Sequence, residues 1–365
     1  TDVNKTKNLW FASQPGLIAS LLDLQEDKNA IDFIMSQKSK TSDWWWPGET
    51  SPYSEIKPLI PNNYFDLKKG KTFRYWPDRN LIKLSKNDAI EKISIRLKGI
   101  MLAAAQRFDL ALALSGGLDS RVMLAASKDI KEKICIYNAK RPDMSSKHPD
   151  ITIPRRLTSK LNLDYHYIPQ SNDIDDEFYK AYEMNAPCAS MEIIPGLQAE
   201  LKYFKQQKVA ATGNILETAR VLHKIFNPDE NIASGEFLAS ITKMKGSPFA
   251  IEAFENWLSS ANEIFNINIY DLFHWEQKCG RWLSNNSLVF FMAWKEVLFP
   301  FNCRNLLIDF LSVSDVHRMP GDYPFFKDLI KHMWPDLLSE PINPQQKKGF
   351  LFRSMKRLKR TITLR

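Results

Sequence analysis

The sequence predicts an α/β protein whose parallel sheet is covered by helices on both faces. Four short apolar segments are separated by intervals long enough for a helix, and they lie at residues 110–114, 133–137, 165–168 and 208–212. Strands that alternate with helices are typical of parallel sheets with two buried faces. A hairpin-like pattern precedes these segments and a helix-rich stretch follows them. We therefore also expect a small β-rich N-terminal piece and a helical C-terminal part.

The β-rich piece is expected to span residues 1–85, and the main domain residues 86–365. Within the piece, residues 15–24 predict a short helix. Two strand-like runs around a glycine, at residues 64–76, are typical of a hairpin. The tryptophan- and proline-rich residues between these two elements favour extended or turn structure. We expect the aromatic side chains of this piece to pack against the rest of the chain.

The main domain is expected to begin with a long helix over residues 87–107, where apolar residues recur at helical spacing. Its helical part is predicted over residues 248–311. In open α/β sheets, ligands bind beyond the carboxyl ends of the strands. Ser115, Tyr137 and Thr212 are each expected near such an end, so they should converge on one pocket.

A glycine-containing turn, Ser-Gly-Gly-Leu-Asp-Ser at residues 115–120, follows the first of these strands and precedes a helix. The two adjacent glycines let the backbone approach a ligand closely, and the helix start presents N–H groups and a positive dipole end. The hydroxyls of Ser115 and Ser120 can donate to phosphate oxygens. A carboxylate in such a turn, Asp119, fits when Mg²⁺ stands between it and the anion. The sequence therefore predicts a phosphate-binding loop that uses magnesium.

This turn resembles the pyrophosphate-binding loop (PP-loop) of the N-type ATP pyrophosphatases. Its leucine at the fourth position is most similar to the asparagine synthetase and β-lactam synthetase branch. A Walker loop would instead require Gly-Lys followed by Ser or Thr. The resemblance extends over residues 86–350 and implies an adenine nucleotide α-hydrolase-like fold. It also implies a ligase that uses ATP and Mg²⁺ to adenylate a carboxylate, releases pyrophosphate, and passes the acyl group to an amine or ammonia.

A second segment, residues 212–217, resembles the family's other nucleotide-binding turn. Thr212 and Gly213 match that turn, and Glu217 stands where the family has its second magnesium-binding aspartate. Asn214 replaces an acidic residue that in some relatives is linked to orienting the nucleophile. Because an amide can position a group but cannot take its proton, the identity of a general base stays open.

A third segment, residues 345–350, resembles the family's lysine-containing stretch near the C-terminus. Alignment on the Gly-Phe that follows favours Lys347 over Lys348 as the cation that neutralises phosphate charge. The resemblance thus assigns catalysis to Lys347, Asp119 and Glu217, and magnesium to the two carboxylates. The residues expected to contact the nucleotide are Ala113, Leu114, Ser115, Gly116, Gly117, Leu118, Asp119, Ser120, Tyr137, Thr212, Gly213 and Lys347.

The N-terminal residues 11–22 resemble the last part of the glutaminase-type domain of these relatives, whose earlier part and catalytic cysteine have no counterpart in this sequence. The chain is therefore expected to use an amine substrate, free ammonia, or a separate protein that supplies ammonia or delivers the substrate. A small-molecule, peptide or sugar carboxylate is expected as the acyl donor.

The charge distribution bears on the alternatives. The net charge of +8 comes from residues 347–365, which hold eight Lys or Arg and no Asp or Glu. A PP-loop protein that modifies tRNA or binds nucleic acid through this tail is the alternative function, and docking of the tail on a membrane surface is less favoured. The four cysteines form no C-x-x-C pair, and neither a signal peptide nor an apolar run long enough to span a bilayer occurs. We therefore expect a reduced, cytoplasmic protein.

Overall fold

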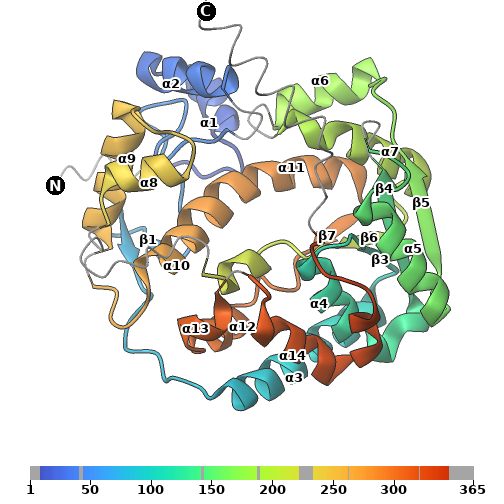
Figure 1. The fold of residues 1–365 in the computed structure, drawn as a ribbon. Coiled ribbons are helices and arrows are strands. Elements are labelled where there is room, and N and C mark those ends of the chain that lie inside the picture. Colours follow the sequence, from blue (N-terminus) through green and yellow to red (C-terminus); the bar gives the residue numbers. More distant parts are fainter. Residues whose placement is uncertain are drawn as a thin grey trace, which may run out of the picture.

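A five-stranded parallel sheet forms the centre of the computed structural model, which describes residues 9–40, 44–140, 144–186, 190–221, 233–261, 263–319 and 321–344 (Figure 1). The strands stand in the order β5-β4-β3-β6-β7. Their bounds are β3 Leu110–Ala113, β4 Ile134–Lys140, β5 Tyr165–Pro169, β6 Val209–Ala211 and β7 Glu296–Leu298. The predicted parallel sheet is confirmed.

The order of the strands fixes where a ligand can enter. The chain starts at the central strand β3, moves outward through β4 to β5, and then returns to the other side of β3 to add β6 and β7. The connections that leave β3 and β6 therefore run in opposite directions from their carboxyl ends. In an open α/β sheet, this reversal opens the crevice that holds ligands.

Helices cover both faces of the sheet, as expected. Because strand residues alternate between faces, Leu110 and Leu112 join one buried cluster with α3, α4 and α14, whereas Ala111 joins a second cluster with α7 and α11. Figure 1 shows these two layers on either side of the strands. The helices of the sheet region are α3 Lys86–Arg107, α4 Leu118–Ala126, α5 Pro149–Leu161, α6 Asp176–Asn185, α7 Ile194–Phe204 and α14 Pro324–Met333. Short 3₁₀ turns are η1 Lys128–Lys133, η2 Met191–Ile193, η3 Leu216–Ala219 and η6 Pro335–Ser339.

The remaining helices form the predicted helical part. They are α8 Gly235–Ile241, α9 Pro248–Ser260, α10 Ile269–Phe273, the π-helical segment η5 His274–Leu283, α11 Ser284–Ala293, α12 Arg304–Leu311 and α13 Asp315–Arg318. One stretch in this region is a correction, because residues 296–298 form the edge strand β7 rather than part of a helix. Three residues are too few for a strand pattern to appear in the sequence. Along the described ranges, no helix combines the length and apolar character needed to cross a membrane.

The N-terminal piece contains the predicted hairpin, β1 Asn63–Asp66 with β2 Lys71–Arg74, and the predicted helix α1, Pro15–Leu22. It also contains a helix that the sequence pattern does not indicate, α2 Lys28–Lys38. The expected packing of aromatic side chains is present in part: Trp45 lies against Phe254 of the helical part, whereas Trp10 and Phe11 are at least half exposed. Figure 1 shows α1 and α2 beside α8 and α9.

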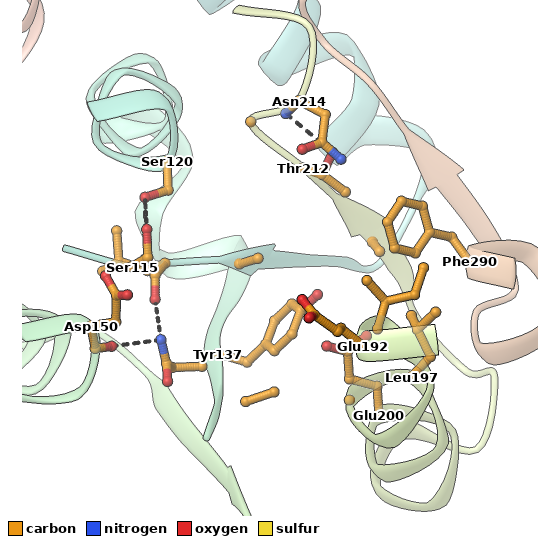
Figure 2. Close-up of a pocket in the computed structure, with 18 of the residues that line it drawn as sticks. Ser115, Ser120, Tyr137, Asp150, Glu192, Leu197, Glu200, Thr212, Asn214 and Phe290 are labelled. Carbon is orange, nitrogen blue, oxygen red and sulfur yellow. Dashed lines mark hydrogen bonds between the residues drawn. The ribbon is translucent and has the colours of Figure 1, made fainter. Parts of the chain in front are cut away.

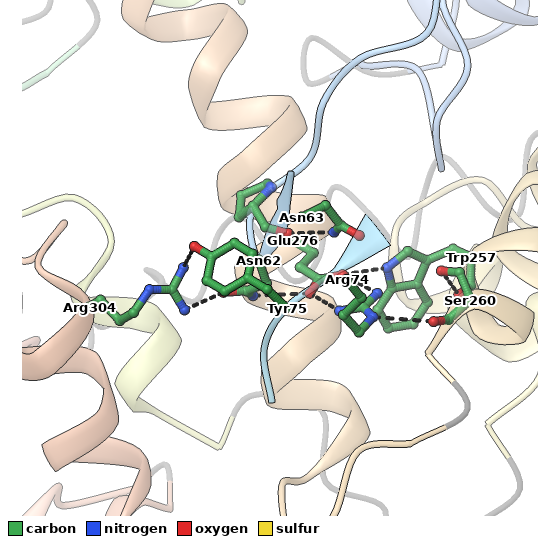
Figure 3. A network of polar contacts seen from close by, with 9 residues as sticks. Asn62, Asn63, Arg74, Tyr75, Trp257, Ser260, Glu276 and Arg304 are labelled. Carbon is green, nitrogen blue, oxygen red and sulfur yellow. Dashed lines mark hydrogen bonds and ion pairs between the residues drawn. The ribbon is translucent and has the colours of Figure 1, made fainter. Parts of the chain in front are cut away.

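A buried polar network also joins the hairpin to the helical part (Figure 3). The Glu276 carboxylate on η5 is fully buried and accepts hydrogen bonds from Arg74, from Asn62 Nδ2 at 3.0 Å and from Trp257 Nε1 at 2.8 Å. Arg304 Nη1 extends the network by donating to Asn62 Oδ1 at 2.8 Å. Both oxygens of this buried carboxylate are therefore satisfied by side chains from other elements.

Candidate active site

A cavity of about 810 Å³ opens at the carboxyl ends of β3 and β6 and extends along the face of the sheet that α7 and α11 cover. Ser115, Tyr137 and Thr212 all line it, so the convergence expected from the sequence is confirmed. Figure 2 shows Ser115 and Thr212 on two separate loops, with the Tyr137 ring between the first loop and α7. Tyr137 lies within β4 rather than at its end, because that strand continues to Lys140.

The loop after β3 is held by its own hydroxyls. Ser115 N donates to Ser120 Oγ at 3.1 Å, and Gly117 N donates to Ser115 Oγ at 3.1 Å. The two hydroxyl oxygens also lie 3.1 Å apart. Helix α4 begins directly after Gly117, and no side chain caps it. Its first-turn N–H groups are thus available to an anion in the manner of other helix N-termini.

A carboxylate already occupies the Gly116 amide. Gly116 N donates to Asp150 Oδ1 at 2.9 Å, and Asp150 lies in the first turn of α5. A Cβ at Gly116 would stand 3.2 Å from the same oxygen, so the absence of a side chain permits this approach. An amide N–H that donates to one anion can donate to another, and a phosphate bound there would have to displace Asp150. Asp150 carries no motif that would single it out in the sequence.

The loop after β6 touches the start of α4. A Cβ at Gly213 would lie 2.9 Å from the Asp119 carbonyl carbon and 3.0 Å from Ser120 N, so only glycine allows this contact. Two residues later, Ile215 adopts a φ of 80°, a left-handed conformation that β-branched residues rarely adopt. The two predicted nucleotide-binding turns are therefore one continuous surface.

The two predicted magnesium ligands lie close enough to repel each other. Burial raises the pKa of Asp119 to about 6; the Arg220 guanidinium opposes this rise, and the Glu217 carboxylate adds to it. Arg220 Nη2 donates to Asp119 Oδ2 at 3.0 Å, whereas Asp119 Oδ1 is buried and has no partner among the described residues. Asp119 lines the cavity and its unpartnered carboxylate oxygen suits Mg²⁺, which prefers oxygen ligands, whereas Glu217 is not among the lining residues.

The other residues predicted to contact the nucleotide do not all line the cavity. Ala113 and Leu114 line the cavity, whereas Leu118 is buried in the hydrophobic core at the first position of α4, so its side chain cannot reach a ligand. Lys347 and Lys348 lie outside the described residues. The chain that leads to them is anchored at the loop, because Asn343 N donates to Gly116 O at 2.9 Å. Four extended residues span about 14 Å at most.

A buried arginine fixes this C-terminal segment against α4. Arg121 is fully buried, and its guanidinium donates to the carbonyl oxygens of Leu337 at 2.7 Å, Glu340 at 3.2 Å and Pro341 at 3.3 Å. Burial lowers the pKa of Arg121 to about 10, so the group remains charged at neutral pH. Arg121 thus helps to hold residues 337–341 against α4.

Replacing Arg121 with methionine is expected to lower the free energy of unfolding by about 3 kcal/mol, because the carbonyl groups lose their charged donor. Urea denaturation followed by circular dichroism measures the loss. Arg156→Met is the matched control, since Arg156 pairs with Glu340 of the same segment but is more than half exposed. Its loss should be much smaller, because an exposed ion pair contributes little to stability. Equal losses in the two variants would contradict the anchoring role.

Several residues of the site carry no sequence motif. Asp150 and Arg220 act on the loop from positions 34 and 101 residues away from their partners. Glu200, on α7, lines the same cavity from the opposite wall. A polar residue on the buried face of an otherwise apolar helix is the one sequence feature that points to Glu200.

No family model matches this sequence, and neither does any curated protein. Among solved structures, phosphoadenylyl-sulfate reductase from Candida auris matches with 15% identity, over 37% of this chain and 70% of that chain, at a TM-score of 0.22. An NH₃-dependent NAD synthetase from Campylobacter jejuni matches with 15% identity, over 52% and 96%, at 0.27. A U34-tRNA thiolase from Methanococcus maripaludis matches with 12% identity, over 78% and 84%, at 0.30. Similarity at this level does not establish the activity of this chain.

Proposed function

We propose that this chain is an ATP-dependent ligase that activates a carboxylate as an acyl-adenylate and forms an amide. The observation that carries the proposal is the unpartnered, buried Asp119 Oδ1 at the contact between the two loops. Carboxylates in a loop built for an anion are explained by a cation that joins them to a phosphate.

The proposed reaction has two steps. A carboxylate oxygen of the substrate attacks the α-phosphorus of ATP, the bond to the bridging oxygen breaks, and pyrophosphate leaves. An amine nitrogen then attacks the acyl carbon and loses a proton, and AMP leaves. The loop at residues 115–120 holds the β- and γ-phosphates, and Lys347 is proposed to neutralise their charge. Magnesium, held by Asp119 and Glu217, supplies further charge neutralisation for the leaving pyrophosphate.

The lining of the cavity favours a small substrate over a nucleic acid. Four carboxylates, Asp119, Asp150, Glu192 and Glu200, line it, and Lys243 is the basic residue among its described lining residues. Such a lining lacks the clustered cations on which binding of a nucleic-acid backbone depends. A small amine-bearing substrate has the complementary charge.

Exchange of labelled pyrophosphate into ATP tests the proposal. A panel of amino acids, short peptides and sugar acids is offered singly with Mg²⁺ and ATP, and exchange above background is expected only with a suitable carboxylate. Nucleotide products are then separated after addition of an amine, and AMP is expected. Production of ADP and phosphate in place of AMP and pyrophosphate would overturn the proposed reaction.

A further inference from the structure

Part of the cavity lies beyond the loop at residues 115–120 that is proposed to hold the phosphates, and Tyr137, which the resemblance assigned to the nucleotide, belongs to this part. This part lies between the sheet and helices α7 and α11, where the small side chains of Ala113 and Ala210 leave space above the strands. Its walls are mostly apolar and aromatic, and Figure 2 shows Tyr137, Leu197, Phe290 and Glu200 around it. A narrow apolar chamber that connects to the loop is therefore available to part of a substrate.

Glu192 and Glu200 both line this part of the cavity, and of the two Glu200 is the buried one. Its side chain is only 9% exposed, and Trp294 Nε1 donates to Oε2 at 2.8 Å. Across the described ranges Glu200 forms no ion pair, and its second oxygen has no hydrogen-bond partner. Burial raises the pKa of Glu200 to about 7, and the Trp294 hydrogen bond opposes this rise. A buried carboxylate without a cation is costly, so a ligand that supplies the cation would be stabilised there.

The aromatic residues beside Glu200 suit the same ligand. The rings of Tyr137 and Trp294 lie 5.2 Å apart between centroids, and Phe204 packs on both. Tyr137 and Trp294 are 4% and 2% exposed, so their positions are fixed by packing. Faces of aromatic rings attract cations, and tryptophan does so most strongly. Burial, together with the Glu200 carboxylate, raises the pKa of the Tyr137 hydroxyl well above its usual value, so the hydroxyl stays neutral.

We propose that Glu200, Tyr137 and Trp294 form a binding subsite for an ammonium group on the substrate. The substrate would carry a primary amino group on a short apolar chain, with the reacting group at its other end, near the loop. The bound amino group stays charged and is recognised rather than consumed. This inference rests on the proposed function for the identity of the reaction, but binding of the ammonium group itself can be measured without ATP.

Calorimetric titration with n-butylammonium chloride tests the subsite, with n-butanol as the neutral probe of equal chain length. The ammonium probe is expected to bind and the alcohol is not. Glu200→Gln keeps an oxygen that accepts from Trp294 but removes the charge, so its affinity for the ammonium probe should fall about tenfold or more. Glu177→Gln, on the exposed surface of α6, is the matched control and should bind like the unchanged protein. Equal binding of the alcohol, or an unchanged affinity in Glu200→Gln, would overturn the proposal.

The pH dependence in the unchanged protein gives a second test that needs no variant. The probe binds the ionised carboxylate, and the pKa of Glu200 is about 7. Affinity should therefore fall about tenfold for each pH unit below 7 and level off above it. The other titratable groups that line the cavity are Asp119, Tyr137, Asp150, Glu192 and Lys243. Because Glu200→Gln retains all of these, the pH dependence should disappear in that variant, and its persistence would assign it to another group.

The two proposals fail in different ways. Ammonium binding without pyrophosphate exchange for any carboxylate would leave the subsite standing and reject the ligase. Exchange without ammonium binding would leave the ligase standing and reject the subsite.

Discussion

Replacing Asp119 with asparagine is expected to lower the rate of carboxylate-dependent pyrophosphate exchange by about 100-fold or more. Asparagine preserves the shape of the side chain but removes the charge that attracts a divalent cation. Asp119 Oδ2 pairs with Arg220, but Oδ1 is buried and lacks a partner among the described residues, so this second oxygen is available to a cation. The measurement is exchange at saturating ATP over a range of Mg²⁺ concentrations.

Asp129→Asn is the control for this experiment. Asp129 is 68% exposed, forms an ion pair with Lys98 and lies away from the cavity, so exchange should be unaffected. The Asp119 variant also loses its ion pair with Arg220, but it removes a carboxylate whose burial is unfavourable, as the raised pKa of Asp119 shows. Its unfolding midpoint should therefore stay close to that of the unchanged protein. A folded Asp119→Asn protein that retains full exchange would contradict the role of Asp119.

The sheet and the first loop could be predicted because their determinants are local. The apolar run that precedes the loop at residues 115–120 indicates a buried strand, and the two glycines indicate the turn into α4. The structure places β3 at Leu110–Ala113 and α4 from Leu118, in agreement with this pattern. The long helix α3 could be predicted equally well, because its apolar residues repeat at helical spacing over several turns.

The rest of the site depends on residues that meet only through the fold. Asp150 reaches Gly116 because α5 starts beside the loop, and Arg220 reaches Asp119 because the loop after β6 packs on α4. Glu200 becomes a pocket residue only because Ala113 and Ala210 leave room above the sheet. No local pattern encodes these pairings. The strand β7 could not be predicted for another reason. Three residues are too few to show the alternation of apolar and polar residues that indicates a strand.

Replacing Glu276 with alanine is expected to lower the free energy of unfolding by about 3–5 kcal/mol. The change leaves the Arg74 guanidinium, Asn62 Nδ2 and Trp257 Nε1 without their shared acceptor in a buried region. Urea denaturation measures the loss. Glu263→Ala, at an exposed position of the same helical region, should change stability by less than about 0.5 kcal/mol.

A double-mutant cycle separates the charge pair from simple loss of packing. Glu276→Ala is expected to be destabilising because it leaves the Arg74 charge buried without a partner. Adding Arg74→Met should then recover part of the lost stability, so the two changes in the free energy of unfolding should not be additive. Strictly additive losses would mean that Arg74 and Glu276 act independently. The outcome bears on the cavity too, because η5 carries Glu276 at one end and Trp282, which lines the cavity, near the other. A hairpin far from the loop thus helps to hold the wall on the substrate side of the proposed site.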